Sequence, residues 1–161
     1  MAISTSNVAG VALGATDTTA QFATGTTVNL NDGGQAMYVQ AASELSQYAA
    51  VAVLANNTAV MVTTTNAATS KRVGFAQVSI ASGQYGWVQT GGVPVVKLAA
   101  SCLPNVPLFT TATAGVLDDA TVSGNGVGLV VGIVATATAS GATAITCVAG
   151  YPHVSGAGGA V

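Results

Sequence analysis

Apolar and polar residues alternate with a period of two through much of this chain, and this period limits what the chain can fold into. In residues 76–80, apolar side chains alternate with Gln77 and Ser79, and residues 143–148 follow a similar alternation. Successive side chains of a β-strand point to opposite faces, so this pattern places one set on a core and the other towards solvent or a neighbour. No amphipathic helical pattern of ten or more residues occurs. The sequence therefore predicts an all-β protein.

Turn-forming residues interrupt the alternating runs at short intervals. Gly and Asn tolerate positive φ, and Asp and Asn bond to nearby backbone groups, so clusters of these residues predict turns. We expect turns at residues 31–34, 55–57, 82–84, 91–92, 117–119 and 123–126. Between them we expect strands near residues 26–30, 36–40, 49–55, 60–64, 73–80, 85–90, 93–98, 107–110, 128–135 and 143–149. Short strands at this spacing predict a compact β-barrel or β-sandwich of about eight to ten strands.

The chain of 161 residues fits one domain with loose ends. Residues 1–25 and 154–161 are rich in small residues and hold few large apolar side chains, so neither end can order itself alone. We expect an N-terminal arm at residues 1–25, a β domain at residues 26–153 and a flexible C-terminal tail at residues 154–161. The ends are either frayed termini or arms that order against a neighbouring subunit. A single helical turn at residues 43–48, capped by Ser43, is the one helical candidate.

Charge is unusually scarce in this sequence. Asp, Glu, Lys and Arg make up 5% of the chain, whereas about 25% is typical of soluble domains. The apolar share is 50% and the net charge is −2, a composition that does not suit a disordered chain. The surface is therefore covered by hydroxyls, amides and backbone, or is hidden against other subunits. From this scarcity we expect an oligomer, with a trimer preferred.

The same composition argues against several partners and locations. Nucleic-acid binding depends on many phosphate contacts, which three basic residues cannot supply. The most apolar stretches, residues 48–55 and 127–135, are about half the length of a membrane-spanning helix, so we expect no membrane insertion. The N-terminal region shows no signal-peptide pattern, which predicts synthesis in the cytoplasm without export.

Residues able to perform chemistry are few and scattered. Cys102 and Cys147 have no metal-binding spacing and are expected to be buried small apolar residues. His153 is the one histidine, and no sequence signature places a nucleophile or an orienting acid beside it, so a surface or loop position is expected. We therefore predict no catalytic, cofactor-binding or metal-binding residues, and no enzyme activity.

Three further motifs have simple structural interpretations. Asp118 and Asp119 form the one acidic pair, but the remaining oxygen ligands of a Ca²⁺ loop are missing, which favours a turn. Lys71 and Arg72 indicate a solvated loop before a strand. Residues 124–132 are rich in glycine but lack the Lys-Ser or Lys-Thr of a phosphate-binding loop, and instead suit tight turns and close packing.

Three of the few aromatic residues lie near one another in the sequence. If residues 73–80 and 85–90 form a hairpin, then Phe75, Tyr85 and Trp87 can meet across its strands. We interpret this cluster as a core or interface anchor. A sugar-binding platform is the alternative.

Several segments between residues 18 and 153 share a pattern with a known family. They are Tyr38-Val39-Gln40-Ala41 with Gln47-Tyr48-Ala49, then Thr64-Thr65-Asn66-Ala67-Ala68, then Arg72-Val73-Gly74-Phe75-Ala76-Gln77 running into Gln84-Tyr85-Gly86-Trp87-Val88, and residues 107–117 leading to Val131-Gly132-Ile133-Val134. These segments resemble the small decoration, or cement, proteins that coat the capsids of tailed bacteriophages.

This resemblance implies a small β-barrel that binds rather than catalyses. Such proteins add to an assembled shell, often as trimers at local threefold positions, and brace it against the pressure of the packaged DNA. The implied partners are the lattice of the major capsid protein and other copies of the chain, and the implied location is the capsid surface of the virion. The resemblance implies no catalytic residues and no cofactor.

Two other roles remain open from the sequence. A tail-tube subunit is also a β-sandwich with arms. A host-binding fibre or adhesin module would be favoured by sequence repeats, which are not found, or by an exposed aromatic patch around Trp87.

Overall fold

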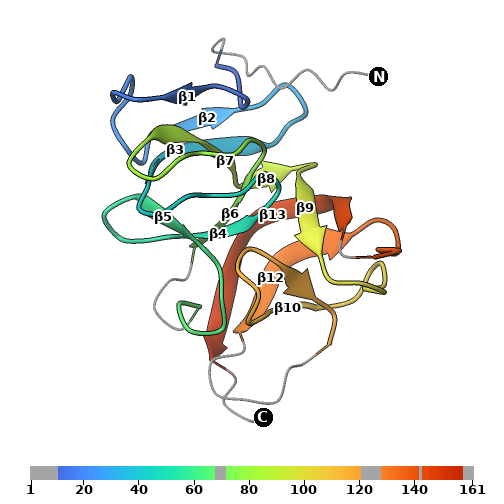
Figure 1. Cartoon of the computed structure of the whole chain (residues 1–161). Coiled ribbons are helices and arrows are strands. Elements are labelled where there is room, and N and C mark those ends of the chain that lie inside the picture. The colour runs from blue at the N-terminus through green and yellow to red at the C-terminus, as the bar shows by residue number, and fades with distance from the viewer. Residues whose placement is uncertain (1–10, 68–71, 121–127, 142, 158–161) are drawn as a thin grey trace.

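The computed structural model of this chain contains two closed rings of β-strands that are joined by the pairing of β6 with β13 (Figure 1). The structure describes residues 11–67, 72–120, 128–141 and 143–157, and in these ranges it contains thirteen strands and no helix. The strands are β1 (Thr16–Asp17), β2 (Thr27–Asn29), β3 (Gln35–Ala41), β4 (Ala50–Val53), β5 (Thr58–Met61), β6 (Arg72–Ala76), β7 (Tyr85–Gln89), β8 (Gly91–Gly92), β9 (Val95–Leu98), β10 (Leu108–Thr110), β11 (Leu117–Asp118), β12 (Gly128–Ala135) and β13 (Thr143–Ala157). The prediction of an all-β fold is confirmed, and the architecture is a barrel rather than a sandwich.

The first barrel consists of β3, β5, β4, β6 and β7, which pair in that order. The ring closes where β6 meets β7, with Phe75 opposite Gln89 and Ala76 opposite Val88. Its interior is filled by small and branched side chains from alternate strand positions, such as Val39, Val51 and Val88. Closure satisfies the backbone of every strand in the ring, which removes the exposed edges that an open sheet would carry.

The second barrel consists of β9, β13, β12, β10 and β11. It closes where β11 pairs in parallel with β9, with Leu117 opposite Leu98. The long strand β13 also joins the two barrels, because Ala149 and Gly150 pair with β8 and His153 pairs with Arg72 of β6. Figure 1 shows the first barrel above the second, and β13 passes the junction between them and continues down the second barrel, where it pairs with β12.

Strands β4 and β6 of the first barrel lie between the two cores and form a wall that both cores pack against, here called the shared wall; apart from Arg72, their residues are buried. Val51 and Val53 of β4 point into the first barrel, whereas Ala50 and Ala52 pack with the core of the second. All four residues of β4 are buried, which explains why its sequence is a continuous apolar run rather than an alternating one. The core of the second barrel therefore continues to the outer face of the first.

The N-terminal segment packs on the outside of the first barrel. β1 pairs with β7 and β2 pairs with β3, and Leu13 is buried against these strands. The Tyr38 hydroxyl donates a hydrogen bond of 2.6 Å to the Asp17 carboxylate, which ties the segment to β3. The arm expected at residues 1–25 is therefore folded onto the body from residue 11 onwards, and residues 1–10 lie outside the described residues.

Each of the ten expected strands has a counterpart in the structure, and the differences lie in short or unexpected elements. Gly91–Gly92 and Leu117–Asp118 were assigned to turns but form β8 and β11, and β1 was not expected. β13 continues to Ala157, so residues 154–157 belong to the sheet rather than to a tail.

The helical turn expected at residues 43–48 is wrong, because Leu45 forms a bridge with Ile80. The side chain of Leu45 is fully buried in the first barrel, and burying it outweighs the weak helical preference of a single turn.

Candidate functional site

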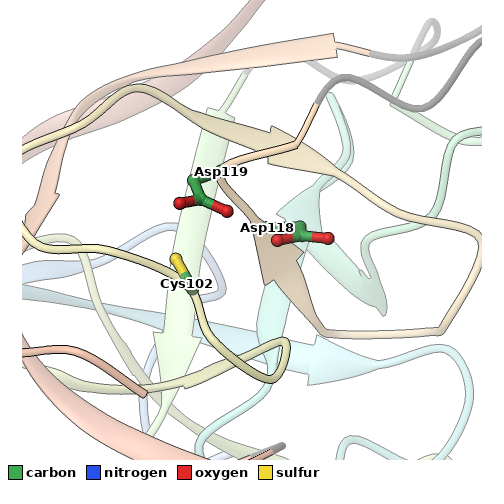
Figure 2. A group of neighbouring side chains, drawn as sticks. All are labelled: Cys102, Asp118 and Asp119. Carbon is green, nitrogen blue, oxygen red and sulfur yellow. The ribbon is translucent and has the colours of Figure 1, made fainter. Parts of the chain in front are cut away.

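The acidic pair and one cysteine form the one group of three potential metal ligands among the described residues. The Sγ atom of Cys102 and carboxylate oxygens of Asp118 and Asp119 all lie within 4.8 Å of one another (Figure 2). Asp118 ends β11, which pairs with β10 and β9, and Cys102 follows β9. Asp118 and Asp119 are adjacent in the sequence, and the pairing of neighbouring strands brings Cys102, which lies 16 positions before Asp118, up to them.

The chemistry of this group favours a structural role. Asp119 accepts a hydrogen bond of 2.9 Å from the backbone N–H of Leu103, which holds the loop after β9 in place. Burial raises the pKa of the Cys102 thiol, and the negative charges of Asp119 and Asp118 raise it further. A neutral thiol is a poor metal ligand because metals bind the thiolate. Two half-buried carboxylates beside a protonated thiol offer less than Ca²⁺ or Zn²⁺ requires.

Both cysteines are free thiols with fully buried side chains. Cys147 points into the core of the second barrel from β13. Burial and the neighbouring Cys102 raise its pKa to about 12. The expectation that both act as small buried apolar residues agrees with this placement.

These raised pKa values predict that the protein loses stability in alkali. The folded protein favours the neutral thiol, because the pKa of Cys147 in it lies above the ordinary value of 9.0. The stabilisation that the neutral Cys147 thiol adds to the free energy of unfolding is therefore complete below pH 9.0 and is lost as the pH rises through about 12. Allowing for solvent screening, we expect the free energy of unfolding to fall by about 3 kcal/mol over this range. Urea unfolding at several pH values measures it. The Cys147→Ala variant is the control and should show a shallower pH dependence; equal slopes for both proteins would contradict the assignment.

The single histidine lies at the mouth of the first barrel rather than in a catalytic arrangement. His153 is exposed on β13, and its Nδ1 lies 3.4 Å from the carbonyl oxygen of Tyr151. The surface position expected for His153 agrees with this location.

A cavity of about 130 Å³ opens at the same mouth. Arg72, assigned to a solvated loop, is instead the exposed first residue of β6 and lines this cavity. Its guanidinium donates hydrogen bonds to the Leu54 carbonyl oxygen at 2.9 Å and to Asn57 Oδ1 at 3.0 Å. Lys71 lies outside the described residues. Ligand pockets usually span several hundred Å³, so this cavity is too small for most cofactors or substrates.

The aromatic cluster exists, but with different members. Tyr38 and Trp87 lie with ring centroids 5.0 Å apart, and Phe22 packs edge-on against both at 5.3 Å. Tyr85 stacks on Tyr38 at 6.1 Å. The expected meeting of Phe75 with Tyr85 and Trp87 is wrong, because Phe75 packs in the core of the second barrel, whereas Tyr85 and Trp87 pack with Tyr38 and the N-terminal segment. Trp87 is 2% exposed, so its indole offers no open face for a sugar.

The glycine-rich stretch is described only from residue 128 onwards. Gly132 has a φ of +82°, and a Cβ there would lie 2.6 Å from the carbonyl oxygen of Gly150. Glycine thus permits a β-bulge between β12 and β13 at this point, where the register shifts between Val131 and Ile133. The prediction of turns and close packing agrees with this feature.

The sequence analysis missed an exposed apolar surface on the second barrel. Val134 of β12 and Val148 of β13 pair directly and are 39% and 49% exposed, and Val93 is 43% exposed. We call the surface formed by Val93, Val134 and Val148 the valine face. The sequence of residues 128–135 could have indicated this surface, because apolar residues occupy both the inward and the outward positions of the strand.

The described residues contain no helix that is long and apolar enough to cross a membrane. No known protein-family model matches the chain, and none of the curated protein sequences matches it. The fold, the scarcity of charge and the valine face are therefore the observations on which a function can be proposed.

Proposed function

We propose that this protein is a structural virion protein that binds the outside of a phage capsid lattice and stabilises it. The observation that carries the proposal is the valine face, an exposed apolar surface on a body with almost no charge. Monomeric proteins rarely leave apolar patches open, and such patches usually mark contacts with other proteins. Burying apolar area stabilises such a contact by ~25 cal/mol per Å² before the cost of association.

Two further features support a binding role. Both barrels are closed and packed around apolar cores, which gives a rigid body whose surface needs little reordering on binding. Contacts made by uncharged groups also change little with salt concentration, which suits a particle exposed to varied media. A decoration protein needs both properties.

The fibre or adhesin alternative loses its main structural support. That role would be favoured by an exposed aromatic patch around Trp87, but Phe22 covers this indole and leaves it 2% exposed. The tail-tube alternative predicts that the protein binds to tails rather than to the capsid lattice. The imaging experiment described next distinguishes these two locations.

The test is to mix the purified protein with expanded phage shells that lack it, and to image the particles by electron microscopy. We expect density at regular positions on the lattice and disruption of the shells at a higher temperature than without the protein. Unexpanded shells serve as the control, because weaker binding to them would show that the binding site forms when the shell expands. Density confined to tails would replace the proposal with the tail-tube role, and no binding at saturating protein would overturn it.

A further inference from the structure

We propose that the cavity at the mouth of the first barrel binds a small carboxylate whose body is a single apolar ring, with benzoate as the simplest example. The residues that line this cavity do not include any of the valine face. The inference therefore assigns a ligand-binding site that is separate from the proposed contact with a capsid, and the two are tested independently.

The open end of the first barrel forms the walls of the cavity, and β13 crosses it. Val53 of β4 lines the cavity together with side chains of β2, β3 and β6. The Tyr151 amide donates a hydrogen bond of 3.0 Å to the Thr90 carbonyl oxygen, and two residues later His153 pairs with Arg72 of β6. Backbone pairing on both sides thus fixes this part of β13 across the opening, so the sheet itself sets the shape of the cavity.

The size and lining of the cavity suit one apolar ring. Its volume is about 130 Å³, and an engineered protein cavity of about 150 Å³ with apolar walls binds one molecule of benzene. Met37, Val53, Val73 and Pro152 supply apolar wall, and a thioether makes favourable contacts with aromatic rings. A fused ring system or a long acyl chain would exceed this volume.

Two of the few basic side chains of this protein converge on the cavity. The sequence holds three Lys and Arg residues and one histidine, and of these Arg72 and His153 lie opposite each other across β6 and β13 and both line the cavity. None of the residues that line it in the described chain is Asp or Glu. Hydrogen bonds to Leu54 and Asn57 hold the Arg72 guanidinium in place, with its Nη1 3.7 Å from Met37 Sδ in the cavity wall. The positive charge therefore attracts a carboxylate at the mouth while the ring enters the apolar interior.

Tyr151 lies at the rim of the cavity in an unusual backbone conformation. Its φ is +48°, which is uncommon for a residue with a side chain, and such conformations cluster at ligand-binding sites. The side chain lines the cavity and is 67% exposed. A bound ring would give the Tyr151 ring an aromatic partner and would cover part of this exposed surface.

Titration of the isotope-labelled protein with benzoate, followed by NMR, tests the proposal. We expect a dissociation constant of about 1 mM or below, because a ligand of this size gains a limited free energy per atom. The amide signals that shift should belong to residues around the cavity, such as Val73, Thr90 and His153. Acetate lacks the ring and benzyl alcohol lacks the charge, so each should bind at least about 10-fold more weakly than benzoate.

Substitutions separate the site for the ring from the site for the head group. Val53→Phe fills the cavity and should abolish binding of benzoate. Arg72→Gln removes the charge and should weaken binding about 10-fold, whereas Arg72→Lys keeps the charge and should restore most of the affinity. Ser82→Phe is the matched control and should bind as the wild type does, because Ser82 is exposed in the turn that meets Ala41 at the far end of β3. Circular dichroism confirms that each variant is folded.

Three results would overturn the inference. They are no binding at about 20 mM benzoate, shifts confined to residues away from the cavity, and equal affinities for acetate and benzoate, which would show that charge alone explains the binding. If Val53→Phe does not fold, the comparison of Arg72→Gln with Arg72→Lys and the shifts in the wild-type protein still decide the question. None of these results bears on shell binding, which is measured separately.

Discussion

Replacing Gly34 with alanine is expected to destabilise the protein by about 3 kcal/mol or more, and to leave little folded material at 37 °C. Gly34 lies in the turn between β2 and β3, where it packs on β8. An added Cβ would overlap the carbonyl oxygen of Gly91 and would lie 2.7 Å from its carbonyl carbon and 2.8 Å from Gly92 Cα. These neighbours are backbone atoms, so no side chain can rotate away to make room.

The position of this contact makes the effect larger than a local turn defect. β8 pairs with β13, and through this pairing the first barrel is joined to the second. The Gly34 amide donates a hydrogen bond of 2.8 Å to Asp32, and the Gln89 side chain donates one of 2.9 Å to the Gly91 carbonyl oxygen. Moving β8 to admit a methyl group would strain these bonds together with the junction.

Thermal and urea unfolding of Gly34→Ala and Gly14→Ala measure the effect. Gly14 is the matched control, because a Cβ added there meets no atom within 4 Å, and its substitution should change the free energy of unfolding by less than about 0.5 kcal/mol. Gly34→Ala with wild-type stability would show that the turn and β8 are not packed as described.

The Phe75→Ala substitution is expected to cost about 3 to 5 kcal/mol, because it leaves a cavity in the core that joins the two barrels. The Phe75 side chain has no exposed surface. It projects from β6 in the shared wall and packs in the same cluster as Leu98, Leu108 and Val130 of the second barrel. The void would therefore weaken both barrels.

Urea unfolding followed by circular dichroism and by Trp87 fluorescence measures this prediction. Because the core is continuous across the shared wall, we expect one transition reported by both probes, shifted to lower urea with a similar slope. Phe22→Ala is the matched control: Phe22 is 42% exposed, so its loss should cost less than half as much. Two separate transitions, or equal costs for the two substitutions, would contradict the common core.

Much of the local structure of this protein could be predicted from its sequence. Period-two alternation identifies a strand because side chains of a strand alternate between faces whatever the strand pairs with, and residues 76, 78 and 80 show it clearly. Glycine and asparagine identify turns because few other residues adopt the required backbone angles. The ten expected strands and the burial of both cysteines depended only on such local preferences.

The candidate surface could not be predicted in this way. Alternation separates two faces of a strand but does not say which face another part of the chain will cover. The outer face of β7 carries Trp87 and is covered by Phe22, some 65 residues earlier in the sequence, whereas the outer face of β13 carries Val148 and stays open. Nothing in the local sequence of either strand distinguishes these outcomes.

The sequence alone therefore determined two properties of this protein. It determined the kind of element, which is a short strand ended by a tight turn, and it determined that the surface carries almost no charge. The tertiary structure decided that the strands close into two barrels, that β4 and β6 are buried between them, and that the valines of β12 and β13 face outwards. The physical reason is that strand closure and burial depend on hydrogen bonds and packing between residues far apart in the chain, such as His153 with Arg72, and these partners are chosen only when the whole chain folds.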